Sequence, residues 1–329
     1  MMANQKLLLS LVFSQLVLAS FFLDLSNANG LQLGFYKKTC PDLELIVHRT
    51  LFGYISRDQT LAAPLLRMHF HDCFVRGCDG SVLINSTTKN QAEKAAIPNQ
   101  TLRGFNVIDA IKSAVEKKCP GLVSCADILA MVARDAVLMV GGPYWDVPTG
   151  RRDGRVSNSL EALAQLPSPF ADITTLKQNF AAKGLSVKDL VVLSGSHTIG
   201  IGHCFVVAIR LYNFTGKGDT DPSLDPNYAA YLKKKCKPGD LKTVAEMDPG
   251  SFKTFDDHYY TIVAKRRGLF PSDAALLDDS ETKAYVRLQS HMHGYSFAQD
   301  FAESMKKMGQ IEVLTGKQGE IRKNCAVVN

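Results

Sequence analysis

The stretch from Arg67 to Ser81, RMHFHDCFVRGCDGS, concentrates residue types that bind metals or move protons. It holds two histidines, two cysteines and two aspartates within fifteen residues. Imidazole and thiolate groups favour transition metals, whereas carboxylate and hydroxyl oxygens favour Ca²⁺. The chemistry therefore depends on the secondary structure that carries these side chains and on whether the cysteines are oxidised.

Arg67 and His71 stand four residues apart, so on a helix they share one face, while His69 points elsewhere. The spacing of His69 and His71 would chelate a metal well on a strand and poorly on a helix. An arginine beside a histidine also repels a cation. The pair suits acid–base work, in which the imidazole moves a proton and the guanidinium stabilises developing negative charge. The alternative is a helix with incidental charged residues.

The second half of the stretch offers oxygen ligands on a turn that contains two glycines. Asp72, Asp79 and Ser81 are hard ligands that suit Ca²⁺, and a Cys73–Cys78 bridge would hold such a loop in shape. An acidic surface turn is the alternative.

A second candidate is His197, within LVVLSGSHTIG (190–200), a stretch of otherwise apolar or small residues. A lone histidine in such a place is more often a buried core residue with its hydrogen bonds made inside the protein than a metal ligand. Gly195 and Gly200 would nevertheless let a large, flat group approach the backbone.

The N-terminus predicts a signal peptide over residues 1–30. Lys6 precedes an apolar run over 7–22, and small residues at Ala28 and Gly30 fit a signal-peptidase site. A membrane anchor is the alternative, but polar residues interrupt the short run. We therefore expect secretion, with no membrane association after cleavage.

Secretion changes the interpretation of the cysteines. An even number in an oxidising compartment indicates disulfides rather than thiolate ligands. Eight cysteines allow 105 pairings, so spacing alone leaves the connectivity open. The eight are Cys40, Cys73, Cys78, Cys119, Cys125, Cys204, Cys236 and Cys325.

The elements that must position these residues are helices. Apolar residues recur at helical spacing in 61–66, 105–111, 126–140 and 297–308, and alternating strands are scarce. Loops are expected at 141–143, 149–158, 166–170 and 215–226. The pattern predicts one predominantly helical domain. The net charge of +6 is spread along the chain, without the clustered basic patch of a nucleic-acid binder.

Seven motifs, in order along the chain, together resemble the secreted haem peroxidases of plants, the class III peroxidase family. They are RMHFHDCFVRGCDGS (67–81), VSCADILA (123–130), VPTGRRDG (147–154), LSGSHTIG (193–200), RLYNF (210–214), TFDDHYY (254–260) and FAESMKKMG (301–309). The matches run from about Leu33 to the C-terminus, and the ordered set is highly specific.

The resemblance implies a mainly α, two-lobed fold with haem between the lobes and very little β structure. Residues 31–329 would form this single domain. The implied disulfides are Cys40–Cys119, Cys73–Cys78, Cys125–Cys325 and Cys204–Cys236.

On one side of the haem, His71 matches the base that moves the peroxide protons, and Arg67 matches its cationic partner. Phe70 matches the aromatic residue that keeps bulky donors from the iron. Asn99 matches the asparagine that orients the histidine. Of the three Asn-x-Ser/Thr sequons, Asn85 and Asn213 are therefore expected to carry glycans and Asn99 is not.

On the other side, His197 matches the axial ligand of the haem iron, and Asp273 matches the carboxylate that accepts its other ring proton. Pro167 matches a carbonyl position that meets aromatic donors. Ile199 and Val206 depart from relatives with aromatic residues near the haem, which puts the donor preference in doubt.

Two Ca²⁺ sites also follow from the resemblance. The first comprises Asp72, Val75, Gly77, Asp79 and Ser81. The second comprises Thr198, Asp248, Ser251, Thr254 and Asp256, with a serine at 251 where relatives often have threonine.

The implied activity is that of an extracellular peroxidase of the cell wall, active in wall cross-linking, lignification and oxidative stress. It would contain one haem b and two Ca²⁺ ions, act as a monomer, and oxidise two small aromatic donors for each H₂O₂. The chain ends four residues past Cys325, so we expect no vacuolar sorting extension. The sequence does not distinguish among lignin precursors, wall tyrosines and auxin as donors.

Two other functions compete with this one. The first is a secreted, disulfide-bonded binding or storage protein on the same fold, with haem absent or inert. Such a protein should have lost some of the site residues, but all of them are present here: Arg67, His71, Asn99, His197 and Asp273. A zinc hydrolase built on His69, His71 and the cysteines conflicts with helical geometry and with oxidised thiols.

Overall fold

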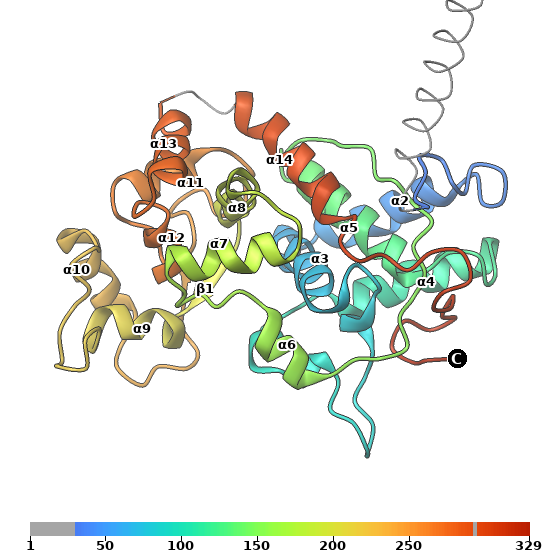
Figure 1. Ribbon diagram of the computed structural model, residues 1–329, viewed down its shortest axis with the longest axis horizontal. Coiled ribbons are helices and arrows are strands. Elements are labelled where there is room, and N and C mark those ends of the chain that lie inside the picture. Colours follow the sequence, from blue (N-terminus) through green and yellow to red (C-terminus); the bar gives the residue numbers. More distant parts are fainter. Residues whose placement is uncertain (1–29, 292–294) are drawn as a thin grey trace, which may run out of the picture.

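The computed structural model describes residues 30–291 and 295–329, and nearly all of its regular structure is helical (Figure 1). The predicted signal peptide lies outside the described residues, apart from Gly30. The α-helices are α2 (Leu43–Ile55), α3 (Ala62–Arg76), α4 (Phe105–Lys118), α5 (Cys125–Met139), α6 (Ser159–Gln165), α7 (Ile173–Ala182), α8 (Val187–Ser194), α9 (Cys204–Tyr212), α10 (Pro226–Lys235), α11 (His258–Ala264), α12 (Pro271–Ala275), α13 (Ser280–Gln289) and α14 (Tyr295–Met308). The 3₁₀ helices are η1 (Gln59–Leu61), η2 (Ser81–Leu83), η3 (Glu93–Ala95), η4 (Ile97–Asn99) and η5 (Gly195–Thr198), and the strands are β1 (Ile201–His203) and β2 (Val244–Glu246).

Helix α5 forms the centre of the N-terminal half. Every residue from Cys125 to Val137 is buried, because α3 and α2 pack along it and α4 packs against both α2 and α5. Helix α3, which carries Arg67 and His71, thereby lies against α5 near the middle of the molecule (Figure 1).

The C-terminal half is built around α8. Helices α13 and α14 pack on α8, and α11 packs on both α13 and η5. Figure 1 shows α8, α11 and α13 grouped on the side of the molecule opposite α2 and α4. One apolar core nevertheless runs through both halves, from Leu43 and Val47 of α2 to Phe297 and Phe301 of α14.

Polar residues define where several helices begin. Ser124 Oγ accepts a hydrogen bond from Asp127 N at the start of α5. Ser186 and Asp189 form a reciprocal capping box at the start of α8. Asp225 caps α10, whose first residue is Pro226.

A small outlying unit follows η5. Strands β1 and β2 pair antiparallel, with Ile201 opposite Glu246, and α9 and α10 pack beside them in a separate apolar cluster. The Cys204–Cys236 disulfide joins these two helices.

The described chain contains four disulfides, in the four pairings that the resemblance implied: Cys40–Cys119, Cys73–Cys78, Cys125–Cys325 and Cys204–Cys236. The expected fold class, mainly helical with four disulfides and very little β structure, is confirmed. None of the helices in the described part of the chain combines the length and the apolar character needed to cross a bilayer.

Candidate active site

His71 lies on α3 and is held by one hydrogen bond from a distant segment. Its Nδ1 pairs with Asn99 Oδ1, and Asn99 Nδ2 donates to the Glu93 carbonyl oxygen at 2.8 Å. Since the Asn99 oxygen accepts, Nδ1 of His71 carries the proton and Nε2 keeps a free lone pair. Burial, followed by the charge of Arg67, holds the pKa of His71 well below its usual value. The imidazole is therefore neutral, and its free Nε2 is able to accept a proton.

Arg67 lies one turn before His71 and is held by two contacts from the η4 region. Its Nη1 donates to Thr101 Oγ1 at 2.9 Å and its Nη2 donates to the Pro98 carbonyl oxygen at 2.7 Å. Burial lowers the pKa of Arg67 to about 10, which leaves it charged at neutral pH. Phe70 packs edge-on to His71, with 5.5 Å between ring centroids.

His197 lies in η5 and is paired with a carboxylate. Its Nδ1 is 2.8 Å from Asp273 Oδ1, which also accepts a hydrogen bond from the Tyr259 hydroxyl at 2.9 Å. Phe270 N donates to the other carboxylate oxygen at 2.8 Å. Burial disfavours the ionised form of Asp273, but His197 and these donors outweigh it and the pKa of Asp273 falls below its ordinary value. An ionised Asp273 fixes the proton of His197 on Nδ1, which leaves Nε2 free to bind a metal.

The two glycines near His197 allow close packing. A Cβ at Gly195 would lie 2.4 Å from the Tyr260 hydroxyl, so this glycine makes room for protein side chains rather than for a flat group. Gly200 has a φ of +100°, and a Cβ there would lie 2.9 Å from Ala63 of α3. Gly200 thereby brings the segment after His197 against the helix that carries Arg67 and His71.

These residues fit a haem. A single imidazole backed by a carboxylate is a common axial ligand for haem iron, and a second imidazole beside an arginine is suited to handling peroxide. His197 and His71 come from different halves of the molecule, and each has Nδ1 engaged by a protein partner and Nε2 available.

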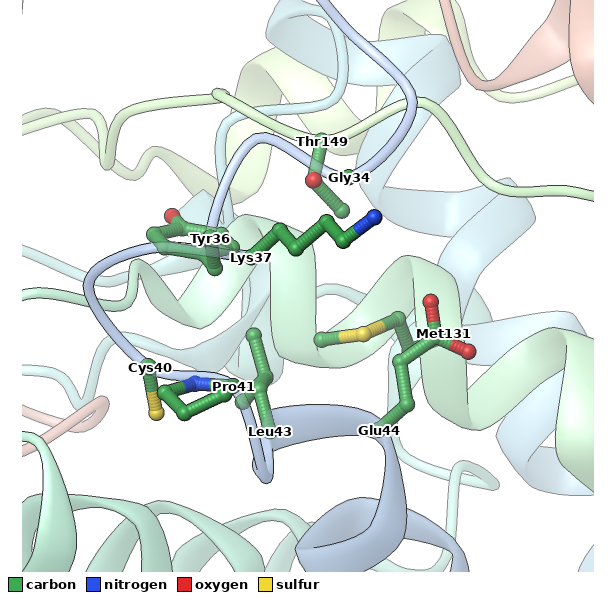
Figure 2. Close-up of a pocket in the computed structure, with 9 residues that line it drawn as sticks. All are labelled: Gly34, Tyr36, Lys37, Cys40, Pro41, Leu43, Glu44, Met131 and Thr149. Carbon is green, nitrogen blue, oxygen red and sulfur yellow. The ribbon is translucent and has the colours of Figure 1, made fainter.

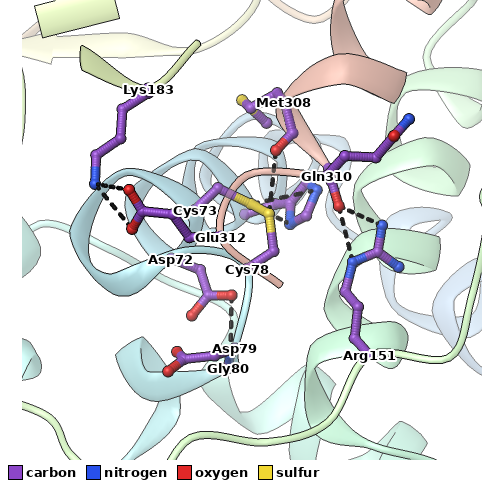
Figure 3. Close-up of a disulfide and its surroundings, with 12 residues drawn as sticks. Asp72, Cys73, Cys78, Asp79, Gly80, Arg151, Lys183, Met308, Gln310 and Glu312 are labelled. Atoms are coloured by element: carbon purple, nitrogen blue, oxygen red, sulfur yellow. Dashed lines mark hydrogen bonds and ion pairs between the residues drawn. A yellow bond between two sulfur atoms is a disulfide. The ribbon is translucent and has the colours of Figure 1, made fainter. Parts of the chain in front are cut away.

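The C-terminal part of α3 and the loop after it gather buried oxygen ligands around the Cys73–Cys78 disulfide (Figure 3). Asp72 Oδ2 accepts from Gly80 N at 2.9 Å, and Asp79 Oδ1 accepts from Ser81 N at 2.9 Å. The Ser81 hydroxyl is buried and has no hydrogen-bond partner among the described residues. Val75 and Gly77 lie in the same turn, at the end of α3.

Glu93, on η3, also belongs to this cluster, although it was not identified from the sequence. Neither of its buried carboxylate oxygens has a partner in the described chain. Burial raises the pKa of Glu93 to about 8 and that of Asp79 to about 6. Burial, followed by the charge of Asp79, raises the pKa of Asp72 well above its ordinary value. Such a concentration of buried carboxylates is costly without a cation. No local sequence signal marks Glu93, because it lies outside the turn that contains Asp79 and Ser81.

A second cluster surrounds Thr198, directly after His197. The hydroxyls of Thr198 and Ser251 donate to the two oxygens of Asp256 at 2.9 and 2.8 Å. Asp248 is fully buried, burial raises its pKa to about 6, and its Oδ2 has no partner in the described chain. Thr254 lies in the same loop but is exposed.

The remaining predicted residues lie near these groups. Pro167 is half-buried in a loop whose Pro169 carbonyl accepts from Ser272 N at 3.0 Å, next to Asp273. Ile199 is buried and Val206 is half-buried. Four residues form hydrogen bonds with Asp273 or Arg67 but were not identified from the sequence. They are Tyr259, Phe270, Thr101 and Pro98.

The zinc hypothesis conflicts with the structure. His69 and the sulfurs of Cys73 and Cys78 lie within 4.8 Å of one another, but both sulfurs belong to the disulfide. His71 contacts Asn99 instead and does not join this group.

A surface pocket of about 260 Å³ lies away from all of these residues (Figure 2). It lies mainly between the N-terminal segment and α2, and none of the residues predicted to bind haem, peroxide or Ca²⁺ lines it. Its lining residues are Gly34, Tyr36, Lys37, Cys40, Pro41, Leu43, Glu44, Met131 and Thr149.

Comparison with known proteins identifies the family of this chain. A family model described as "Peroxidase" matches residues 47–291. The chain belongs to the peroxidase family. It is 60% identical over 329 residues to "Peroxidase 27" of Arabidopsis thaliana, with both chains fully covered. It is 61% identical over 301 residues to "Peroxidase 1" of the same plant (91% of this chain and 92% of the relative), and 54% identical over 335 residues to "Peroxidase 1" of Oryza sativa subsp. japonica, again with full coverage.

These relatives are plant class III peroxidases, as the sequence motifs indicated. The chain is a haem-dependent peroxidase, an oxidoreductase whose substrates are H₂O₂ and small reducing donors. The chain is therefore an enzyme, and the alternative of a binding or storage protein on the same fold is wrong.

Proposed function

We propose that this peroxidase uses His71 as its proton-transfer group, Arg67 as its charge stabiliser and His197 as its iron ligand. The hydrogen bond between His71 Nδ1 and Asn99 Oδ1 carries the proposal, because it leaves Nε2 unprotonated. Asn99 is 2% exposed and anchored to the Glu93 carbonyl, so the orientation of the imidazole is fixed before peroxide arrives.

His197 would hold the haem, whose iron would supply the site for reductive cleavage of the peroxide O–O bond. His71 Nε2 takes the proton from the inner oxygen of peroxide and returns it to the departing oxygen, so one residue serves first as base and then as acid. Arg67 stabilises the negative charge on the departing oxygen. A positioned acid–base group of this kind contributes about 10²–10⁴ in rate.

Asp273 gives His197 partial imidazolate character through the hydrogen bond to Nδ1, and so increases the basicity of His197 as a ligand. Tyr259 and the Phe270 amide keep Asp273 in place.

We infer two Ca²⁺ ions per chain and one haem b. The buried carboxylates of Asp72 and Asp79, with the Ser81 hydroxyl and the carbonyls of Val75 and Gly77, would bind the first. Thr198, Asp248, Ser251, Thr254 and Asp256 would bind the second. Partnerless buried oxygens in both clusters support this assignment.

We further infer a signal peptide over 1–30, a single peroxidase domain over 31–329, secretion to the cell wall and a monomeric state. Phenolic donors would meet the Pro167 carbonyl. Cell-wall cross-linking, lignification and the response to oxidative stress are the processes that fit such an enzyme.

The absorption spectrum of the purified holoenzyme tests this function. We expect a Soret band that shifts when H₂O₂ is added and returns when a phenol is supplied. His197→Ala should retain less haem, and His291→Ala, an exposed histidine elsewhere, should retain it fully. A His197→Ala variant with an unchanged Soret band would contradict the assigned ligand, and rates across a panel of phenols would identify the preferred donor.

A further inference from the structure

Three tyrosines form a continuous row that begins at His197. Tyr259 and Tyr260 lie on α11 and Tyr285 lies on α13, and these helices pack side by side (Figure 1). The ring centroids are 6.0 Å apart from His197 to Tyr259, 5.3 Å from Tyr259 to Tyr260 and 5.5 Å from Tyr260 to Tyr285. Each neighbouring pair meets edge to face, so the row consists of rings in direct contact.

The outer end of the row reaches the surface at a carboxylate. Tyr285 is partly exposed, and its hydroxyl donates to Asp300 Oδ2 at 2.8 Å. Asp300 Oδ1 pairs with Lys188 Nζ at 2.7 Å, and the side chains of Asp300 and Lys188 are 22% and 55% exposed. Tyr285 therefore has a hydrogen-bond acceptor, paired with a lysine, that is in contact with solvent.

The inner two tyrosines are sealed from solvent. Tyr259 is 1% exposed and donates to Asp273, and Tyr260 is 0% exposed and donates to the Val191 carbonyl oxygen. Because they cannot meet a donor molecule directly, any electron that this row carries to the His197 region must enter at Tyr285.

A second aromatic branch leaves Tyr260 and differs from this row in its chemistry. Tyr260 also contacts Phe297, and Phe301 connects Phe297 with the buried Trp145. The linking rings in that branch are phenylalanines, which are much harder to oxidise than phenols. In the row ending at Tyr285 every link is a phenol, and only this row ends at a partly exposed hydroxyl with a carboxylate partner.

We propose that Tyr285 is a second oxidation site, at the surface, for phenolic donors too large to approach the haem. It would be connected to the haem region through the rings of Tyr260 and Tyr259. The proposal rests on the proposed function, because peroxide reduction at the haem supplies the oxidant.

The electron balance is simple. Tyr285 loses one electron through the two inner rings to the peroxide-oxidised haem site, and its hydroxyl proton passes to Asp300. A phenolic donor at the surface then gives one electron to the Tyr285 radical and releases its own proton to solvent. Asp300 returns its proton to the Tyr285 oxygen. Two such cycles supply the two electrons for one H₂O₂, which takes up two protons and becomes two waters.

The test compares Tyr285→Phe with Tyr231→Phe in the holoenzyme. Tyr231 is the matched control, because it is 51% exposed, stacks on Tyr228 and does not belong to the row. Each variant is treated with H₂O₂ and a nitroso spin trap, and the adduct is located by peptide mapping. Turnover is measured with a free phenol and with the same phenol attached to a large soluble polymer.

We expect an adduct on Tyr285 in the parent enzyme and in Tyr231→Phe, and none at that position in Tyr285→Phe. Polymer-linked phenol oxidation should fall about tenfold in Tyr285→Phe while free-phenol turnover stays within about twofold of the parent. Asp300→Asn, which keeps the shape but removes the proton acceptor, should also lose the adduct.

An adduct confined to other residues, or equal oxidation of polymer-linked phenol by Tyr285→Phe and the parent, would overturn the proposal while leaving the peroxidase function intact. If the parent enzyme itself did not oxidise the free phenol with H₂O₂, the proposed function would be wrong.

Discussion

His69 and His71 lie two residues apart on α3, yet their surroundings give them unrelated chemistry. The His69 ring lies 3.6 Å from the Cys73 sulfur, and burial lowers its pKa to about 3. His71 has Asn99 on one nitrogen and the other nitrogen free. The difference follows from helical geometry, which turns side chains two positions apart to different sides.

The role of His71 predicts the behaviour of His71→Ala. Loss of the acid–base group should reduce the rate of reaction with H₂O₂ by about 10²–10⁴. The haem should remain bound, because His197 is unchanged. Stopped-flow measurement of the Soret change after mixing with H₂O₂ gives this rate directly. His48→Ala, at a histidine on α2 whose side chain is 45% exposed, should react like the parent, and a fast His71→Ala enzyme would rule out the assigned role.

The environment of Asn99 predicts which sequons carry glycans. Asn99 is 2% exposed and both ends of its amide are hydrogen-bonded, so a glycan there would break the link to His71. Asn85 and Asn213 are exposed. Glycopeptide mass spectrometry of the protein from a plant host should find glycans at Asn85 and Asn213 and an unmodified Asn99. A glycan on Asn99 in active enzyme would contradict the proposed hydrogen bond.

At the scale of elements, each proposed Ca²⁺ cluster includes the residue that directly follows a functional histidine in the chain. Asp72 directly follows His71 on α3, and Thr198 directly follows His197 in η5. Glu93 adds a second connection, because its backbone carbonyl holds Asn99 while its carboxylate lies in the first cluster. A change in either cluster is therefore transmitted to the haem region through a few covalent bonds.

Removal of Ca²⁺ should consequently disturb the iron. Prolonged treatment with EGTA should lower activity and alter the absorption bands that report the iron spin state, and Ca²⁺ should restore both. Asp248→Asn should show the same spectral change without chelator. Asp278→Asn, an exposed carboxylate outside both clusters, is the matched control. An unchanged spectrum after complete Ca²⁺ removal would disprove this coupling.

At the scale of the whole molecule, the disulfides differ greatly in the length of chain they close. Cys125–Cys325 joins the start of the central helix α5 to the C-terminal segment across 200 residues, whereas Cys73–Cys78 spans 5. The first constrains the overall fold and the second shapes only the loop after α3.

Stability should reflect this difference. By loop entropy the Cys125–Cys325 bridge contributes about 5 kcal/mol to the free energy of unfolding, and the Cys73–Cys78 bridge about 2 kcal/mol. Urea unfolding of the Cys125→Ala/Cys325→Ala and Cys73→Ala/Cys78→Ala variants would measure both losses. The reverse order of stability would show that chain entropy is not the main contribution of the long bridge.

Much of the fold and site follows from short-range sequence patterns. Helical periodicity correctly predicted α4, α5 and α14, because the spacing of apolar residues depends only on near neighbours. The four-residue spacing of Arg67 and His71, and the oxygen-rich turn from Asp72 to Ser81, are likewise local. The ordered motifs then indicated the peroxidase family, and with it the four disulfide pairings found in the structure.

By itself the sequence determined the helices, the peroxidase family and the residue types of the site. Only the tertiary structure decided how these side chains are held. Asn99 reaches His71 across 28 positions and Asp273 reaches His197 across 76. Tyr259 and Glu93 became apparent only when the helices were packed. The reason is physical: local backbone preferences act over a few residues, whereas these contacts depend on how helices distant in the chain bury their apolar faces against one another.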